Sequence, residues 1–326
     1  MRGLWEVLVK NFFKKLFGEA EKKGTGTVAP GSVDTVSKEE KTVPRQAADS
    51  KITAPLSADA FSEYEQPLYP PQLVVGCAQS VGRQRDHNED ALFTLTSNIA
   101  NDASYTTFGL YIIADGMGGH QHGEVASGTA VRAMANCIIR RLYAPLCGLD
   151  PQPPEESLQE ILLAGANEAH QAIIRDAAGG GSTLTVALIL GNQLMIAHVG
   201  DSRAYAIYPD GRFQTITRDH SLVKRLEELG QITSSEAASH PQRNVLYRAL
   251  GQGEPFEPDV ISFPMPLNGY LLLCSDGLWG VVSESEMRDI IQSKPTPHEA
   301  CQALVETANL AGGPDNISVI LIHTPG

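Results

Sequence analysis

The sequence has few cysteines, and they follow no pairing pattern. Its 326 residues contain five cysteines, an odd number, and no two of them are spaced as Cys-x-x-Cys. A disulfide framework would need an even set, and a structural zinc site would need closely spaced pairs of Cys or His ligands. We therefore expect reduced thiols, most of them in the core of a cytosolic protein.

Long hydrophobic runs and internal repeats are also absent. The stretch at residues 4–17 places apolar side chains at helical spacing with charged side chains opposite, which predicts an amphipathic helix over residues 1–17. Polar residues at Lys10, Asn11, Lys14 and Lys15 interrupt it, so it is neither a signal-peptide core nor the run of ~20 apolar residues that spans a membrane. Its apolar face has three destinations: a membrane surface, which the basic side favours, a groove on a partner, or the body of the protein.

Basic residues are scarce in the body of the chain. Residues 1–70 hold ten basic and ten acidic residues, so the whole net charge of −13 lies in residues 71–326. Such an acidic body would repel a phosphate backbone, which argues against nucleic acid as a partner. The excess of Asp either solubilises the surface or binds divalent cations.

The composition divides the chain into three parts. After the helix, residues 18–70 are rich in Gly, Thr, Ser, Pro and Ala, which predicts a disordered linker, and residues 71–326 form one domain of strands and helices. Apolar, turn-bounded segments predict strands at 73–79, 91–95, 108–114, 183–190, 194–200, 203–208, 213–216, 259–263, 270–274 and 317–322. Apolar periodicity predicts helices at 123–142, 155–177, 221–229, 283–292 and 297–309. Strands joined directly, with paired long helices between them, predict a layered α+β domain.

Carboxylates recur at strand ends and in Gly- or Asn-containing turns of this domain. The segments "RDHNEDALF", "IIADGMGG", "AHVGDSRAY", "LLLCSDGLWG" and "AGGPDNISVIL" contribute Glu89, Asp90, Asp115, Asp201, Asp276 and Asp315. One Asp-Gly pair is ordinary turn chemistry. Turn chemistry does not explain why the pattern recurs in five segments. Leaving a carboxylate unpaired at a buried strand end costs several kcal/mol, so carboxylates there are usually paired, shared or bound to a metal.

Basic partners for these carboxylates are too few. Arg85 and Arg203 adjoin two of the segments, but no Lys or Arg lies within several residues of Asp115, Asp276 or Asp315. Hard oxygen ligands without a matching Cys or His set indicate Mg²⁺ or Mn²⁺. A carboxylate cluster can hold two such ions about 3.5 to 4 Å apart, which activate a water for attack on a phosphoryl group.

The order and spacing of longer motifs resemble those of a known family. The motifs are "RQRDHNED", "ADGMGGH", "GSTLTVALI", "HVGDSRAY", "TRDHSLV", "HPQRNVLYRALG", "CSDGLWGVVS" and "GGPDNISVIL". In the order and spacing of these motifs, the chain resembles the metal-dependent (PPM-type, type 2C) protein serine/threonine phosphatases, and it looks most like the bacterial branch. The resemblance implies a four-layer α-β-β-α sandwich of two antiparallel sheets flanked by helices, with the metal ions at one edge. It also implies hydrolysis of phosphoserine and phosphothreonine in proteins, with a protein kinase and its substrates as partners of a monomeric enzyme.

The resemblance assigns roles to single residues. It implies that Asp115, with the Gly116 carbonyl beside it, bridges two Mn²⁺ or Mg²⁺ ions, that Asp276 and Asp315 complete one ligand shell, and that Glu89 and Asp90 serve the other, partly through water. Asp201 matches an aspartate that can hold a weaker third ion with Asp276, or it is a turn residue. Arg85 matches the phosphate-binding arginine, and its alternative role is an ion pair with a nearby carboxylate.

One position departs from the family pattern. Animal members carry a His directly after the metal-binding Asp-Gly, assigned as the general acid, whereas this chain has Met117, which donates no proton. His120 lies three residues further on and is as well suited to a structural hydrogen bond, so the acid stays unassigned; a metal-bound water could serve. Residues 219–251 match the mobile flap of the family beside the cleft.

Two other functions use the same residues. A non-catalytic pseudophosphatase would keep the fold and bind phosphoproteins, although every expected carboxylate is present here. A hydrolase of small phosphoesters would have the same metal centre.

Overall fold

The computed structural model describes residues 72–100, 105–118, 121–148, 154, 156–253 and 256–325. The predicted helix at 1–17, the linker at 18–70 and His120 lie outside these ranges. Within them no helix is long and apolar enough to cross a membrane.

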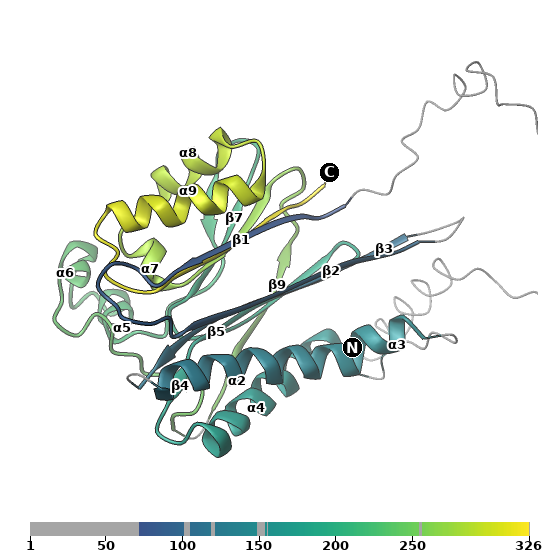
Figure 1. Cartoon of the computed structure of the whole chain (residues 1–326), viewed down its shortest axis with the longest axis horizontal. Helices are drawn as coiled ribbons and strands as arrows, with labels where there is room; N and C mark the ends of the chain where they lie inside the picture. Colours follow the sequence, from purple (N-terminus) through teal and green to yellow (C-terminus); the bar gives the residue numbers. More distant parts are fainter. Residues whose placement is uncertain are drawn as a thin grey trace, which may run out of the picture.

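Two antiparallel sheets form the centre of the domain (Figure 1). The first contains, in spatial order, β1 (Val74–Ser80), β11 (Ile317–His323), β10 (Tyr270–Cys274), β7 (Arg203–Ile207) and β8 (Phe213–Thr215). The second contains β2 (Asp90–Ala100), β3 (Tyr105–Met117), β5 (Leu184–Leu190), β6 (Gln193–Val199) and β9 (Asp259–Pro264), and the short β4 (Gly181–Ser182) pairs with the end of β3.

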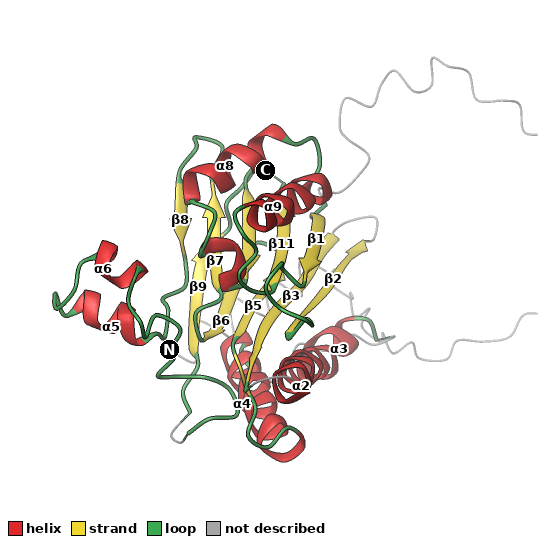
Figure 2. Ribbon diagram, turned by 60° about the vertical axis from the view of Figure 1, so that its left-hand side comes forward, coloured by secondary structure: helices red, strands yellow, loops and turns green. Residues whose placement is uncertain are grey.

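Helices cover the outer face of each sheet. The helices α2 (Gln121–Ile138) and α4 (Leu158–Asp176) pack on the second sheet, and α8 (Glu284–Ser293) and α9 (Pro297–Leu310) pack on the first, as Figures 1 and 2 show. Separate apolar cores fill the space under each helix pair and between the two sheets. This arrangement confirms the predicted four-layer α-β-β-α sandwich.

The alternation of side chains along β3 determines where Asp115 lies. Leu110 and Ile112 belong to the core under α2 and α4, whereas Tyr111 and Ile113 belong to the core between the sheets. Because strand side chains alternate with a period of two, Asp115 continues the row of Tyr111 and Ile113. Its carboxylate therefore lies at the margin of the space between the sheets.

The predicted elements are present, and most of the differences lie at their ends. The strand that we expected to stop before Asp115 continues to Met117, because β4 pairs with Gly116 and Met117. The helix predicted at 123–142 divides into α2, a π-helical turn η2 (Ile139–Tyr143) and α3 (Ala144–Leu146). The turn at 208–213 connects β7 and β8 as a hairpin.

The flap of residues 219–251 carries two short helices. They are α5 (Leu222–Glu228), predicted at 221–229, and α6 (Ser234–Ala238), which the sequence analysis missed. The side chain of Ser221 caps α5, and Gly230, with φ of 68°, follows its end in the left-handed conformation that glycine tolerates. A further short helix, α7 (Asp276–Trp279), was also missed and begins at one of the candidate metal ligands.

Candidate metal centre

Two of the predicted ligands are direct cross-strand neighbours. Asp90, the first residue of β2, lies opposite Asp115 of β3 in the antiparallel register. The Asp90 side chain extends toward the other sheet, where the hydroxyl of Ser275 donates a hydrogen bond of 2.8 Å to Asp90 Oδ2. Asp90 is only 8% exposed, so the pair lies between the sheets rather than on the surface.

Three further aspartates reach the same place from separate connections. Asp276 follows β10 and begins α7, Asp315 precedes β11, and Asp201 lies in the turn between β6 and β7. Asp276 interacts electrostatically with Asp115, since its charge contributes to raising the pKa of the Asp115 carboxyl. The fold thus brings together carboxylates that are far apart in the sequence and belong to both sheets.

Burial and mutual repulsion raise the pKa values of these carboxyl groups. Burial and the charges of Asp276 and Asp315 raise the pKa of Asp90 to about 7, against hydrogen bonds from Ser318 and Ser275 that lower it. Burial and the charge of Asp315 raise the pKa of Asp276 to about 6. Burial, followed by repulsion from neighbouring aspartates, also holds the pKa of Asp115 and of Asp201 well above the usual range. A bound cation would reverse this repulsion.

The donor set is suited to a hard divalent cation. Asp90 Oδ1 and Asp276 Oδ1 are buried and lack a hydrogen-bond donor among the residues that the structure describes. Buried carboxylate oxygens left in this way are available as metal ligands. In the same described ranges, however, no three His, Cys, Asp or Glu side chains enclose one ion-sized space. The carboxylates are gathered, but the division of ligands between ions stays a prediction.

Glycines allow the chain to close around this cluster. A Cβ on Gly116 would lie 2.1 Å from the backbone oxygen of Gly123, where the end of β3 meets the first turn of α2. A Cβ on Gly123 would lie 2.5 Å from Glu89 Oε2. The Gly116 amide donates a bond of 3.1 Å to the Glu89 carbonyl. The glycine-rich stretch therefore serves close backbone approach, and Glu89 lies beside the N-terminal turn of α2.

Asn316 holds the loop that carries Arg85 and Glu89. Its Oδ1 accepts a bond of 2.8 Å from the Glu89 amide, and its Nδ2 donates to the carbonyls of Val81 and His87 at 2.8 and 2.9 Å. The sequence analysis gave Asn316 no role. The only available signal was its place directly after Asp315, at the start of a buried strand.

Arg85 is paired with Asp315. Its Nη2 lies 2.7 Å from Asp315 Oδ2, and its side chain is 48% exposed. Asp315 has no Lys or Arg near it in the sequence, but in the fold its basic partner comes from 230 residues away. The ion-pair alternative for Arg85 is present, and the exposed guanidinium still lies at the rim of the carboxylate cluster.

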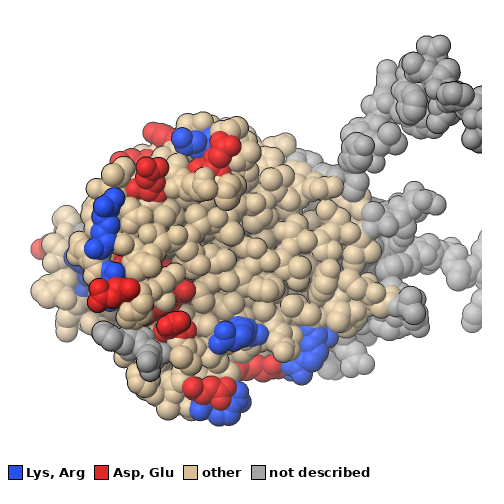
Figure 3. Space-filling view, in the orientation of Figure 1, with Lys and Arg blue, Asp and Glu red and all other residues tan. Residues whose placement is uncertain are grey.

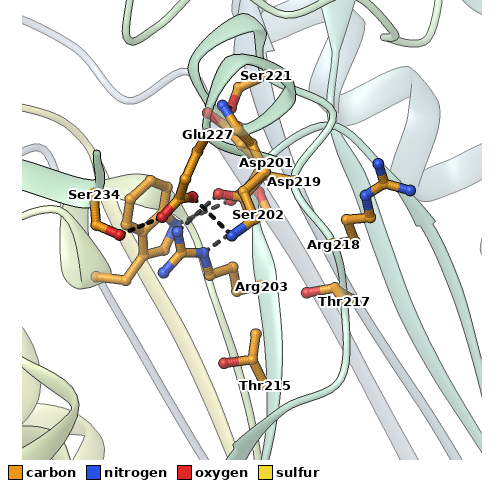
Figure 4. Close-up of polar contacts among 12 residues, drawn as sticks. Asp201, Ser202, Arg203, Thr215, Thr217, Arg218, Asp219, Ser221, Glu227 and Ser234 are labelled. Atoms are coloured by element: carbon orange, nitrogen blue, oxygen red, sulfur yellow. Dashed lines mark hydrogen bonds and ion pairs between the residues drawn. The ribbon is translucent and has the colours of Figure 1, made fainter. Parts of the chain in front are cut away.

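Arg203 neighbours Asp201 in the sequence but binds another carboxylate. It forms two hydrogen bonds with Asp219, at 2.9 and 2.7 Å (Figure 4). Asp201 instead accepts a bond of 3.0 Å at its backbone oxygen from the indole nitrogen of Trp279. The buried carboxyl of Asp201 thus has no pairing partner in the adjacent arginine, contrary to what sequence adjacency suggested.

The surface around the cluster is charged. Figure 3 shows acidic and basic side chains at the end of the molecule where Figure 1 places α5, α6 and α7, and also over the helices at the top and bottom, whereas the surface over the middle of β1 and β2 is uncharged. Met117 ends β3 at this end.

The comparisons with known proteins agree with this geometry. The sequence model of the family described as Protein phosphatase 2C matches residues 76–317. The serine/threonine phosphatase stp of Listeria innocua is 38% identical over 247 residues, which cover 74% of this chain and 92% of that protein. The crystal structure of the serine/threonine phosphatase PstP/Ppp of Mycobacterium tuberculosis superposes with a TM-score of 0.64 at 33% identity, covering 78% of this chain and 100% of that one.

A further solved structure holds metal ions. It is the catalytic domain of the phosphatase PstP in complex with 2 manganese ions, with a TM-score of 0.63 and 32% identity, covering 79% of this chain and all of that one. The family match at residues 76–317 includes every candidate ligand of the acidic cluster, from Glu89 to Asp315. The chain therefore belongs to the protein phosphatase 2C family.

Proposed function

We propose that this protein is a metal-dependent phosphatase that hydrolyses phosphoserine and phosphothreonine in proteins. The observation that carries the proposal is the convergence of Asp90, Asp115, Asp201, Asp276 and Asp315 from both sheets at one end of a type 2C phosphatase domain. The family uses divalent metal ions, and relatives of this chain are named serine/threonine phosphatases.

The carboxylates supply the ligands in this proposal. Asp115, with the Gly116 carbonyl beside it, would serve both ions, Asp276 and Asp315 would complete the ligand shell of one, and Glu89 and Asp90 would serve the other, partly through water. Two Mn²⁺ or Mg²⁺ ions bound there would supply a nucleophilic water near neutral pH and neutralise the phosphoryl oxygens. Asp201, with Asp276, is the candidate for a weaker third ion.

Arg85 binds the substrate phosphate in this proposal. Its exposed guanidinium offers a planar pair of donors that matches two phosphate oxygens. Coordination by Asp315 would weaken the Arg85–Asp315 pair and free those donors. Met117 supplies no proton, so the proposal assigns the general acid to no residue of this chain.

The partners that we propose follow from this substrate class. They are proteins phosphorylated on Ser or Thr, with the kinase that modifies them, and the enzyme acts as a cytoplasmic monomer. The amphipathic segment at 4–17 attaches it to an anionic membrane surface, with residues 18–70 as the tether and residues 71–326 as the catalytic domain. Deleting residues 1–70 should abolish sedimentation with anionic liposomes at low salt and leave the hydrolysis of a soluble phosphopeptide unchanged. Full-length protein that does not sediment would refute the membrane role.

One assay separates the candidate functions. Purified protein is supplied with Mn²⁺ and either a phosphothreonine peptide or p-nitrophenyl phosphate, and phosphate release and peptide binding are both measured. The proposed enzyme has a much higher kcat/KM for the peptide. A preference for the small ester indicates a small-phosphoester hydrolase, and peptide binding without turnover indicates a pseudophosphatase.

A further inference from the structure

The guanidinium of Arg203 contacts the base of the flap. Its Nε and Nη2 donate to Oδ1 and Oδ2 of Asp219 at 2.9 and 2.7 Å, which is a two-point contact that fixes orientation as well as distance. Asp219 is the first residue of the flap, and its side chain is only 7% exposed. The pair is thus shielded from water at the point where the flap leaves the sandwich.

The same guanidinium also contacts Trp279, a residue next to the acidic cluster. Its central carbon lies 3.6 Å from the ring centroid of Trp279, which is the stacked geometry of a cation–π contact. Trp279 closes α7, the helix that begins at Asp276, and its indole nitrogen donates to the backbone oxygen of Asp201. One side chain therefore connects the flap with the supports of two candidate metal ligands.

The positive charge of Arg203 also acts on a carboxylate of the flap helices, that of Glu227. Hydrogen bonds from Ser234 and Lys224, and the positive charge of Arg203 more weakly, lower the pKa of Glu227 on α5. Ser234 belongs to α6, so Glu227 links the two flap helices. Figure 4 shows Arg203 pointing toward Asp219 and Glu227.

We propose that Arg203 is a positioning residue that fixes the flap, through Asp219, relative to Asp201 and Asp276. The position of the flap determines how firmly a phosphopeptide is held over the carboxylates, and this consequence rests on the proposed phosphatase function. The contacts of Arg203 with Asp219 and Trp279 do not depend on that function. A residue that only stabilised the fold would affect all parts of the domain and all substrates alike.

Two variants and a matched control test the proposal. Arg203→Lys keeps the charge but loses the planar stacking and the two-point contact. The double variant Arg203→Gln/Asp219→Asn removes both charges, so no unpaired charge remains buried. Arg212→Lys is the control, because Arg212 also stacks on a ring, that of Tyr208 at 4.1 Å, and pairs with Asp210, but in the exposed β7–β8 hairpin.

The first measurement is hydrogen–deuterium exchange of the metal-free, full-length protein. Both Arg203 variants should accelerate amide exchange in residues 219–251 by roughly tenfold, with β3 and β5 unchanged and the Arg212→Lys protein like the wild type. Unchanged exchange in the flap, or a uniform increase over the whole domain, overturns the proposal. Because no turnover is needed, this result is independent of the proposed function.

The second measurement is steady-state kinetics with Mn²⁺. The Arg203 variants should raise KM for a phosphothreonine peptide by about fivefold to tenfold while kcat/KM for p-nitrophenyl phosphate stays within about twofold. Equal losses on both substrates contradict a role through the flap. Wild-type protein that hydrolyses neither substrate refutes the proposed function, and the exchange experiment then decides the role of Arg203 by itself.

Discussion

Asp90 and Asp115 face each other directly across the antiparallel pair β2–β3. Like charges at directly opposite positions destabilise such a pair, and burial increases the cost. Nothing in the apolar pattern of either strand requires this arrangement. The most economical physical explanation is that a cation neutralises the pair when the protein is active, and this explanation leads to a measurable difference between the metal-free and metal-bound states.

Asp115→Asn should separate the structural cost of the pair from its function. In the metal-free protein the substitution relieves repulsion, so we expect the free energy of unfolding to stay level or rise by up to about 1 kcal/mol. The stabilisation that Mn²⁺ gives to the wild type should disappear, because binding to the folded state is lost. Thermal melting with and without Mn²⁺ measures both effects. Asp210→Asn, in the exposed hairpin, is the control, and a variant that Mn²⁺ still stabilises fully would remove Asp115 from the centre.

Arg85→Ala tests the phosphate-binding role. If the guanidinium binds phosphate in the ground state and more strongly in the transition state, KM for a phosphopeptide rises and kcat falls as well. Arg83→Ala is the matched control, since Arg83 is exposed on the same loop and donates to the Asn309 backbone rather than to the cluster. Kinetics of the Arg85 variant that match those of the control would show that Arg85 is only a surface ion-pair residue.

Asn316→Ala should displace the loop that carries Arg85 and Glu89. The substitution removes the bonds to the Glu89 amide and to the carbonyls of Val81 and His87, and each buried group left without a partner costs about 1–3 kcal/mol. We expect a lower melting temperature together with a higher Mn²⁺ concentration for half-maximal activity. A lower melting temperature with an unchanged Mn²⁺ requirement would limit Asn316 to a structural role.

The buried side chain of His198 should make the stability of the protein depend on pH. Burial, followed by the charge of His220, lowers the pKa of His198 from 6.5 to about 3 in the folded protein. Between these pH values the unfolded chain binds a proton that the folded protein excludes, so the free energy of unfolding falls as the pH decreases from 6.5 toward 3. The slope from this group is about 1.4 kcal/mol per pH unit.

Urea denaturation of His198→Gln at pH 6.5, 5.5 and 4.5 measures that contribution. The variant should be less stable at pH 6.5, since His198 hydrogen-bonds to Thr185 and to the Arg218 backbone, but its stability should fall less steeply with acid. His298→Gln, which replaces an exposed histidine on α9, is the control. Parallel curves for the wild type and His198→Gln would contradict the assignment.

The sequence predicted the layers well because their signals are local. The apolar runs of β3 and β10 are visible in short windows, and so is Ser221, the capping residue of α5. Pairing between strands that are distant in the sequence cannot be seen in such windows. The extension of β3 to Met117 depends on β4, and the four residues of α7 are too few to show a helical period.

The candidate site shows the same division. The carboxylates could be found because each follows or precedes an apolar strand, and the family resemblance assigned their roles. The partners of Arg85 and Arg203 could not be found, because Asp315 and Asp219 come from other parts of the chain. Sequence adjacency pointed to Asp201 for Arg203, whereas the folded chain turns the guanidinium toward the flap.

The most direct test of the account is phosphate release from a phosphothreonine peptide by the wild type and by Asp276→Asn, with Mn²⁺ and after exhaustive chelation. Asp276→Asn keeps the side-chain shape and removes one ligand charge from the cluster. We predict rapid release by the wild type with Mn²⁺, none after chelation, recovery when Mn²⁺ is restored, and a loss of at least about a hundredfold in kcat for the variant. Wild-type activity that survives chelation, or a variant as active as the wild type at the same Mn²⁺ concentration, would contradict the metal centre on which the account rests.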